Sequence, residues 1–408
     1  MAAPPPTVIS LFTGVGGLDY GFEAAGCETA VAVEKDEICA KTLRQSRTWP
    51  VLAKDIHTVP IDEILEAGSL RRKEVDIVIG GPPCQPFSKS GYWAAGDVSR
   101  MEDPRASTLR AMLRLVRDVK PRAILIENVD GIQFRGKDEG LAWLLAEMAC
   151  INAEVGTQYL PAVKVLNAAD YGVPQRRRRL FIVAGRDGQT FRFPDHTHCD
   201  SPEKRRALDL EPHRTAWDAL GDLEDDESDE LQPSGHWAEL LPSIPEGHNY
   251  QWHTDRGGGL PLFGWRRRYW SFLLKLAKDR PSWTIQANPG PATGPFHWQS
   301  RLLSARELCR LQTIPDDVEI AGDRRAMQRQ IGNAVPSLLA EVIARAIREQ
   351  LLDGRSHEGP LKLLPTCRGD APEPEPVAEV PEIYHSHLGA HAPHPGEGLG
   401  PRASERAA

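Results

Sequence analysis

Short apolar runs alternate with longer amphipathic segments through the first half of the chain. Each run spans four or five residues, and glycine or a charged residue follows closely, which is typical of buried strands. We predict strands at residues 8–12, 29–33, 75–79, 123–126 and 180–184. Because helical segments lie between them, this half favours an α/β fold with a doubly wound, mostly parallel sheet.

Helical spacing of apolar residues predicts further elements between and after these strands. They lie at residues 36–47, 105–119, 304–312 and 336–352, and the second stops before Pro121. From about residue 188 to residue 298 the pattern changes to Pro, Gly, His, Trp and charged residues with little periodicity. That change indicates a second, smaller and loop-rich domain.

The chain therefore divides into four segments. We expect residues 1–187 to begin the main domain, residues 188–298 to form the smaller domain, and residues 299–353 to return and complete the first. Residues 354–408 are rich in Pro, Gly, Glu and Ala with few large apolar side chains. That composition predicts a disordered tail.

Charge is negative overall but unevenly distributed. The 408 residues carry a formal net charge of -8, which argues weakly against a nucleic-acid partner. Arginines nevertheless run together at residues 176–179 and 266–268, while acidic residues concentrate at 222–230. This distribution is compatible with a locally positive cleft on an acidic protein.

Membrane segments, disulfides and metal ligands have weak signatures in this sequence. No apolar run approaches the roughly 18 residues of a membrane span, and the first residues lack the features of a secretory signal, so we expect a cytoplasmic protein with no membrane partner. Seven scattered cysteines suit reduced thiols. His196, His198 and Cys199 lack a fourth ligand, and we expect a polar loop there with no metal.

A glycine-rich turn follows the first predicted strand and leads into a helix. Glycines there let a ligand approach the backbone closely, although the spacing is not the dinucleotide fingerprint and is weak by itself. Glu34 ends the second strand, where a carboxylate can bind ribose hydroxyls. Asp55 lies on the same rim, where it can accept an adenine amine. Together these features favour a nucleoside-type ligand.

A thiol and a carboxylate end two further predicted strands. Cys84 follows two prolines that restrict the backbone, at the edge where open α/β sheets bind ligands, and Glu127 ends the strand at 123–126 on the same edge. Arg177 and Arg179 enter the last strand at alternate positions, so we expect their side chains to share a face.

Thiol, acid and guanidinium groups beside such a pocket suit one reaction. C5 of cytosine is a poor nucleophile until a thiolate adds to C6. A carboxylic acid at N3 stabilises the resulting charge, and arginine can hold O2 or a phosphate. The residues thus point to methyl transfer onto cytosine.

The sequence resembles the DNA cytosine-5 methyltransferase family of bacterial modification enzymes. The matching segments span residues 8–347 in the family's order and are SLFTGVGGLDYGFEAAG, VEKD, KDI, DIVIGGPPCQPFSKSG, ILIENVDG, YGVPQRRRRLFIVA, RELCRLQTIPDD and RQIGNAVPSLLAEVIARAI. The resemblance implies a Rossmann-like, S-adenosylmethionine-dependent methyltransferase fold. It also implies methylation of C5 of a specific cytosine in double-stranded DNA.

Site residues follow by the same resemblance. Cys84 is implied as the nucleophile that bonds to C6, Glu127 as the partner of N3, and Arg177 and Arg179 as the catalytic-site arginines. The implied S-adenosylmethionine site comprises Phe12, Gly14, Gly16, Gly17, Glu34, Asp55, Pro83 and Asn333. Because Asn333 comes late in the chain, the final helix is expected to fold back beside the first strand.

DNA contacts are implied in two places. Ser90 belongs to the loop that in the family closes over DNA once the target base is turned out, an extrusion needed because C6 is shielded in the stacked duplex. Residues 188–298 correspond to the target-recognition domain, where we expect Arg266, Arg267 and Arg268 to face DNA. The Trp residues near 265–270 and 281–286 suit either DNA contact or core packing.

Two functions other than DNA methylation are possible for a chain with this fold. A tRNA cytosine-5 methyltransferase shares the fold, but its recognition region is typically compact and different residues follow its catalytic motif. A catalytically silent DNA-binding subunit would keep only the fold, which the intact Cys84, Glu127, Arg177 and Arg179 oppose. We expect a monomer, with a restriction endonuclease acting on the same site as a candidate partner.

Overall fold

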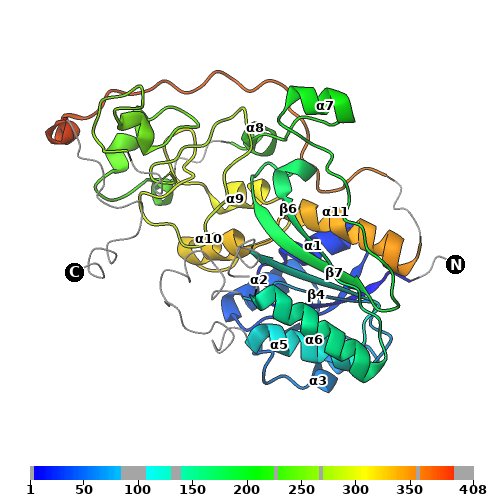
Figure 1. Ribbon diagram of the computed structural model, residues 1–408. Coiled ribbons are helices and arrows are strands. Elements are labelled where there is room, and N and C mark those ends of the chain that lie inside the picture. The colour runs from blue at the N-terminus through cyan, green and yellow to red at the C-terminus, as the bar shows by residue number, and fades with distance from the viewer. Residues whose placement is uncertain are drawn as a thin grey trace, which may run out of the picture.

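A seven-stranded sheet forms the centre of the structure, a computed structural model that describes residues 4–83, 107–129, 139–224, 228–265, 270–354 and 359–389 (Figure 1). The strand order is β3-β2-β1-β4-β5-β7-β6, and β7 runs in the opposite direction to the other strands of the sheet. The strands are β1 (Thr7–Leu11), β2 (Glu28–Val33), β3 (Val51–Leu52), β4 (Ile77–Gly80), β5 (Ala123–Val129), β6 (Ala162–Asn167) and β7 (Arg178–Gly185). The predicted doubly wound, mostly parallel sheet is therefore confirmed.

Helices cover both faces of this sheet because successive strand residues point to opposite sides. On one face Ile9, Val78 and Ile124 pack against α3 (Ile61–Ala67), α5 (Ser107–Val119) and α6 (Glu139–Val155). On the other face Val8 and Ile79 pack against α1 (Gly17–Ala24) and α11 (Ser337–Ile347). Within the described residues the remaining α-helices are α2 (Glu37–Ser46), α7 (Pro202–Leu208), α8 (Ala216–Leu220), α9 (Ala305–Leu311) and α10 (Arg324–Asn333).

Two of the predicted helices begin at side chains that cap the first turn. Asp36 accepts hydrogen bonds from the backbone amides of Ile38 and Cys39 at the start of α2. Ser304 and Glu307 form a reciprocal capping box at the start of α9. α11 ends at Ile347, and residues 348–352 continue as one π-helical turn, so the prediction of one helix over 336–352 covers two elements.

The return of the chain to the first domain depends on close contact between α1 and α11. A Cβ atom on Gly21 would lie 2.4 Å from Cβ of Ala340 and 2.4 Å from the carbonyl oxygen of Ser337. Only glycine allows the two helices to approach this closely. α11 therefore lies against α1, and its Leu338 shares a core with Val8 of β1, so the expected return beside the first strand is observed.

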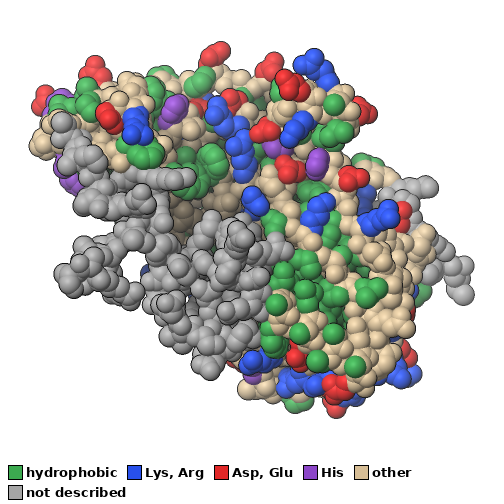
Figure 2. All heavy atoms as spheres, viewed as in Figure 1, with side chains coloured by type: hydrophobic (Ala, Val, Ile, Leu, Met, Phe, Trp, Pro, Cys, Tyr) green, Lys and Arg blue, Asp and Glu red, His purple; other side chains and the backbone are tan. Residues whose placement is uncertain are grey.

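Residues 188–298 fold mostly without regular strands in their described part. α7, α8 and several 3-10 turns surround an aromatic core that contains Tyr250, Phe263 and Phe272. Acidic and basic side chains intermingle on the face seen in Figure 2, with no broad basic surface among the described residues in that view. Across the described ranges, no helix has the length and apolar character needed to cross a membrane.

Composition predicts a disordered tail over residues 354–408, but the described segment at residues 359–389 packs against the rest of the molecule. Residues 359–389 run along the outside of the molecule and reach the loop-rich region (Figure 1). Tyr384 in this segment is 1% exposed. A low content of apolar residues excludes an independent core, but it does not exclude docking onto a core that is already formed.

Candidate functional site

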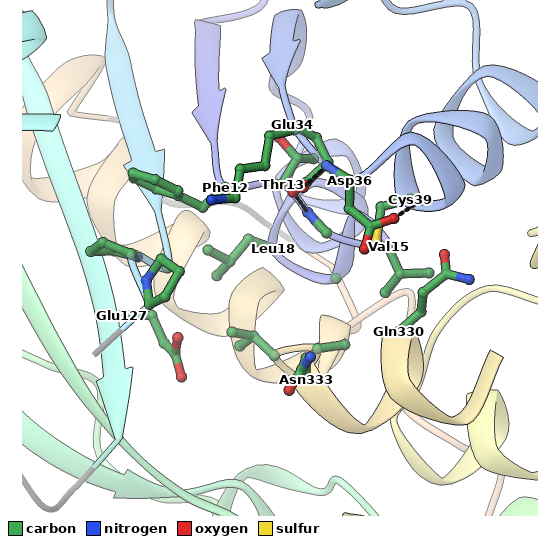
Figure 3. A pocket seen from close by; sticks show the side chains of 18 of the residues that line it. Phe12, Thr13, Val15, Leu18, Glu34, Asp36, Cys39, Glu127, Gln330 and Asn333 are labelled. Carbon is green, nitrogen blue, oxygen red and sulfur yellow. Dashed lines mark hydrogen bonds between the residues drawn. The ribbon is translucent and has the colours of Figure 1, made fainter. Parts of the chain in front are cut away.

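A cavity of about 580 Å³ opens at the carboxyl ends of β1, β2, β4 and β5 (Figure 3). The strand order reverses between β1 and β4, and open α/β sheets bind ligands at such a switch point. Figure 3 shows Glu34 and Asp36 at one end of the cavity and Glu127 at another. Of the residues predicted for the methyl-donor site, those that line it are Phe12, Gly14, Gly17, Glu34, Asp55, Pro83 and Asn333.

The glycine-rich turn shapes one wall of this cavity. Phe12 and Gly14 have φ angles of 54° and 57°, and Gly16 has a φ of 89°. Gly16 is absent from the cavity lining and instead precedes α1, where an added Cβ would lie 2.9 Å from the ring of Tyr20. A Cβ on Gly17 would lie 2.3 Å from the carbonyl oxygen of Val335. Gly16 and Gly17 thus fix the turn, whereas Gly14 lies open to a ligand.

Glu34 holds the turn against the second strand. One carboxylate oxygen accepts the amide hydrogen of Gly14 at 2.7 Å and the other that of Asp36 at 2.8 Å. Burial raises the pKa of Glu34, and these two backbone hydrogen bonds oppose the rise. Each oxygen keeps a lone pair for a further donor. Glu34 can therefore accept ribose hydroxyls while it organises the turn.

Asp55 and Asn333 provide polar groups elsewhere on the wall. Asp55 is partly exposed, and the backbone and side-chain hydrogen bonds from His57 lower its pKa. A carboxylate held in its ionised form is a suitable acceptor for an exocyclic amine. Asn333, the last residue of α10, reaches the cavity from the opposite end of the chain.

Several lining residues were not identified from the sequence. Arg329 of α10 forms an ion pair with Asp36 at 2.8 Å and so joins the return segment to α2 at the cavity rim. Gln330 also belongs to α10, and Asn288 comes from the loop-rich region. Arg329 and Gln330 are the first two residues of the RQIGNA motif. Their place in this motif could therefore have identified them as site residues. No comparable signal marked Asn288.

Glu127 borders the segment that leads to Cys84. A Cβ on Gly81 would lie 3.0 Å from a carboxylate oxygen of Glu127. The neighbouring Asn128 donates a side-chain hydrogen bond to the carbonyl oxygen of Pro82 at 3.3 Å. Cys84 and Ser90 lie outside the described residues, as do Arg266, Arg267 and Arg268. The structure therefore places the residues that precede Cys84 beside the predicted acid.

The two arginines occupy different environments. Nε of Arg179 lies 3.0 Å from a carboxylate oxygen of Glu127, and both residues line the cavity. Arg177 is fully buried, does not line the cavity, and donates hydrogen bonds to the carbonyl oxygens of Ile285 at 3.2 Å and Gly332 at 2.8 Å. Arg179 thus faces the reacting groups, whereas Arg177 joins β7 to two distant segments.

Burial raises the pKa of Glu127 although Arg179 and Arg177 both act to lower it. Desolvation is the largest contribution because the carboxyl lies almost completely inside the protein. A raised pKa keeps more of the carboxyl protonated near neutral pH. Glu127 can therefore act as a hydrogen-bond or proton donor toward a base that enters the cavity.

A sequence-family model decides between the chemistries that this geometry allows. The model of the C-5 cytosine-specific DNA methylases matches residues 6–349, which is most of the chain. The chain belongs to this family. The methylase therefore acts on cytosine C5 in DNA, and its cavity adjoins the sequence that carries the family's PPC motif.

Relatives of the methylase include restriction-modification enzymes. The chain is 42% identical over 377 residues to the type II methyltransferase M.SacI of Streptomyces achromogenes, with 85% of this chain and 94% of that protein covered. It is 32% identical to M.NgoFVII of Neisseria gonorrhoeae, with 84% and 86% covered. Both proteins match this chain over most of their own length.

Solved structures support the fold. A DNA modification methyltransferase structure from an E. coli prophage aligns with a TM-score of 0.59 at 23% identity, covering 85% of this chain and 99% of that one. The S. pombe Dnmt2 methyltransferase aligns with a TM-score of 0.56 at 16% identity, covering 86% and 99%. At these identities the likeness concerns the fold alone.

The buried cysteines among the described residues of the methylase are poor candidates for the nucleophile. Burial raises the pKa of Cys27, Cys39 and Cys309 to about 12 in each case. Among the described cysteines only Cys39 lines the cavity, and there it is protonated at neutral pH and weakly nucleophilic. The described residues contain no group of three or more His, Cys, Asp or Glu side chains arranged to hold a metal ion.

Asp19 gives the methylase a pH-dependent stability. Its buried carboxylate accepts hydrogen bonds from the hydroxyls of Ser10 at 3.0 Å and Thr29 at 3.2 Å, and burial raises its pKa to about 7. The folded state then binds a proton that the unfolded state releases near pH 4. This contribution to stability is therefore complete below pH 4 and is lost as pH rises to 7.

We expect Asp19→Asn to remove that dependence. Urea unfolding at pH 5 and pH 8 should show the unaltered chain losing roughly 3 kcal/mol more than the variant over this interval. The exposed Asp62→Asn serves as the matched control and should keep the original slope. Equal pH slopes for the unaltered chain and Asp19→Asn would show that Asp19 is ionised throughout.

Proposed function

We propose that this methylase transfers the methyl group of S-adenosylmethionine to C5 of a specific cytosine in duplex DNA through a covalent bond between Cys84 and C6. One observation carries the proposal. The buried Glu127 and its partly buried partner Arg179 line the same cavity as the glycine turn, Glu34 and Asp55. Methyl transfer between two bound molecules requires that the methyl-donor site and the base-binding site share one cavity.

The cavity residues fit S-adenosylmethionine by size and by chemistry. About 580 Å³ is within the range that encloses a ligand of this size. Glu34 and Asp55 would hold hydroxyl and amine groups, and Gly14 leaves the backbone open beside them. When bound, the donor supplies an electrophilic methyl group.

The protein's own residues would activate the cytosine. The Cys84 thiolate adds to C6, and protonated Glu127 donates its hydrogen to N3, so that negative charge does not accumulate on the ring. The electron pair released at C5 would then form the bond to the methyl carbon, while the bond from that carbon to the donor's sulfonium sulfur breaks and the donor leaves as a neutral thioether. Loss of the C5 proton to solvent and expulsion of the thiolate from C6 restore the aromatic ring, and N3 returns its proton to Glu127.

Arg179 has two roles in this scheme. Its Nε–H donates to a carboxyl oxygen of Glu127 at 3.0 Å and holds the carboxyl group toward the cavity whether that group is protonated or ionised. Its remaining guanidinium hydrogens can donate to O2 of the extruded base. Arg177 instead holds the segments around Ile285 and Gly332, and we propose that it supports the site from behind.

Among the described residues, the surface that best suits DNA contact contains Trp270, Trp283 and Arg176. Trp270 is 40% exposed, and its ring lies 4.8 Å from that of Trp283. The guanidinium of Arg176 lies 5.2 Å from the same Trp283 ring. Edge-to-face aromatic rings and a cationic group, close in the sequence to the arginine run at 266–268, support DNA contact by the recognition region. We also propose that the methylase is a bacterial cytoplasmic monomer and shares its target site with a restriction endonuclease.

A transfer assay with two substrates tests the proposed function. With tritiated S-adenosylmethionine, we expect label in duplex DNA and at most about 1% of that rate into tRNA, and bisulfite sequencing should place it on cytosine. Preferential labelling of tRNA would support the tRNA methyltransferase instead. Specific DNA binding without labelling of either substrate would support a silent DNA-binding subunit.

A further inference from the structure

Residues 359–389, named here the C-terminal strap, begin on the sheet domain. The backbone amides of Lys362 and Leu363 donate to the two carboxylate oxygens of Glu341 at 2.8 and 2.9 Å. Glu341 belongs to α11 and is 0% exposed, and Arg345 forms an ion pair with it at 2.6 Å. The strap thus starts from a fixed point on α11, although it lies beyond residues 6–349 that the family model matches.

The strap next contacts α8. The backbone amide of Arg368 donates to a carboxylate oxygen of Asp218 at 2.7 Å, and the Arg368 side chain pairs with Asp222 at 2.7 Å. Asp218 is 4% exposed, and its other carboxylate oxygen caps the start of α8 through Thr215. The strap therefore supplies a hydrogen-bond donor to a buried carboxylate oxygen of Asp218 in the loop-rich region.

A buried lysine binds the middle of the strap. The ammonium of Lys278 donates to Glu246 at 2.8 Å, to Glu375 at 2.8 Å and to the carbonyl oxygen of Glu373 at 3.1 Å. Two of these three acceptors belong to the strap. The side chain of Lys278 is only 5% exposed, so loss of the strap would leave a buried charge with one acceptor.

An aromatic anchor fixes the far end of the strap. The ring of Tyr384 stacks on that of Trp237, with centroids 5.5 Å apart and planes inclined by 17°. Its hydroxyl donates to the carbonyl oxygen of His236 at 2.8 Å. Tyr384 is 1% exposed and belongs to the same core as Leu240 and Tyr250. Figure 1 shows the strap running from beside α11 to this distant end of the molecule.

We infer that the C-terminal strap is a positioning element that holds the recognition region at the angle needed for DNA. The inference rests on the proposed function for residues 188–298. That region already contacts the sheet domain through the core around Ile285 and the bridge between Gln175 and Ser282. The strap adds a second connection, because it contacts α11, α8, Lys278 and Trp237 in succession. A recognition region already fixed in place loses less conformational entropy when DNA binds.

Full-length variants of the strap test this inference. Glu375→Gln with Tyr384→Ala removes the ion pair with Lys278 and the anchor ring, while Tyr384→Phe keeps the ring and removes only the hydroxyl. Val377→Ala with Ile383→Ala is the matched control, since these strap side chains are 49% and 60% exposed. The substrate is the duplex that the unaltered chain methylates, together with a copy altered at one base pair of the site.

We expect the first variant to raise KM for the duplex about tenfold and to discriminate less against the altered copy. Its kcat at saturating DNA and its Kd for S-adenosylmethionine should stay within about twofold, and Tyr384→Phe and the control should resemble the unaltered chain. A variant with a lower Tm but unchanged KM and discrimination would overturn the inference, because the strap would then only stabilise the fold. Absence of methyl transfer by the unaltered chain would instead contradict the proposed function, and Kd for the duplex would still test the strap.

Discussion

Replacing Cys84 with alanine is expected to reduce methyl transfer by roughly four or more orders of magnitude, because none of the described groups beside the cavity can take its place in adding to C6. Cys39 lines the cavity, but burial raises its pKa to about 12. Binding of duplex DNA and of S-adenosylmethionine should change by less than about threefold, since the thiol takes part in neither. A single-turnover assay and two equilibrium titrations measure these quantities.

The exposed Cys150→Ala provides the matched control and should keep full activity. Residual turnover by Cys84→Ala above a few per cent would contradict the assignment of the nucleophile. A parallel loss of DNA binding would show that Cys84 has a structural role as well, and the decrease in rate would then no longer measure chemistry alone.

Glu127→Gln is expected to lower kcat by about 10² to 10⁴, which is the usual contribution of a positioned acid. Glutamine can donate a hydrogen bond to N3 but cannot transfer a proton. Burial raises the pKa of Glu127, so the unaltered chain should lose activity as pH rises through that raised pKa and the acid ionises. The variant should lack this alkaline decrease, and kcat measured from pH 5.5 to 9 checks both expectations.

Arg179→Lys tests the ion pair to Glu127 separately. Lysine keeps the positive charge but not the geometry of the pair, in which Nε lies 3.0 Å from the carboxylate. We expect a smaller decrease in kcat than for Glu127→Gln, with the alkaline limb retained. A Glu127→Gln variant that keeps the alkaline limb would assign that limb to another group and contradict the role of Glu127.

The central sheet could be predicted because its strands are continuous apolar runs. Residues 8–12, 75–79 and 123–126 lie within or beside β1, β4 and β5, whose residues are buried from both faces. β6 was missed because it is an edge strand whose side chains are mostly half-buried, so its sequence lacks a clear apolar run. β3 was missed because two residues carry no periodicity.

Site residues could be predicted where a motif places them at the end of a strand. Prediction was poorer for long side chains that bind groups far away in the sequence. Glu34 and Glu127 lie where the sheet edge predicted them. Strand alternation placed Arg177 and Arg179 on one face, yet Arg177 contacts carbonyl groups at residues 285 and 332, which periodicity cannot reveal. The strap was missed for a related reason, since its polar contacts with Asp218 and Lys278 involve partners far away in the sequence.

The covalent bond between Cys84 and C6 is the central claim, and duplex DNA with 5-fluorocytosine at the target tests it most directly. Fluorine cannot leave C5 as a cation, so the thiol cannot be eliminated after methyl transfer. In the presence of S-adenosylmethionine we expect a protein–DNA complex that survives denaturing electrophoresis, carries the donor's methyl group and maps to the peptide that contains Cys84. A fully active preparation that gives no such complex, or one that crosslinks through Cys39 or Cys309, would contradict the mechanism.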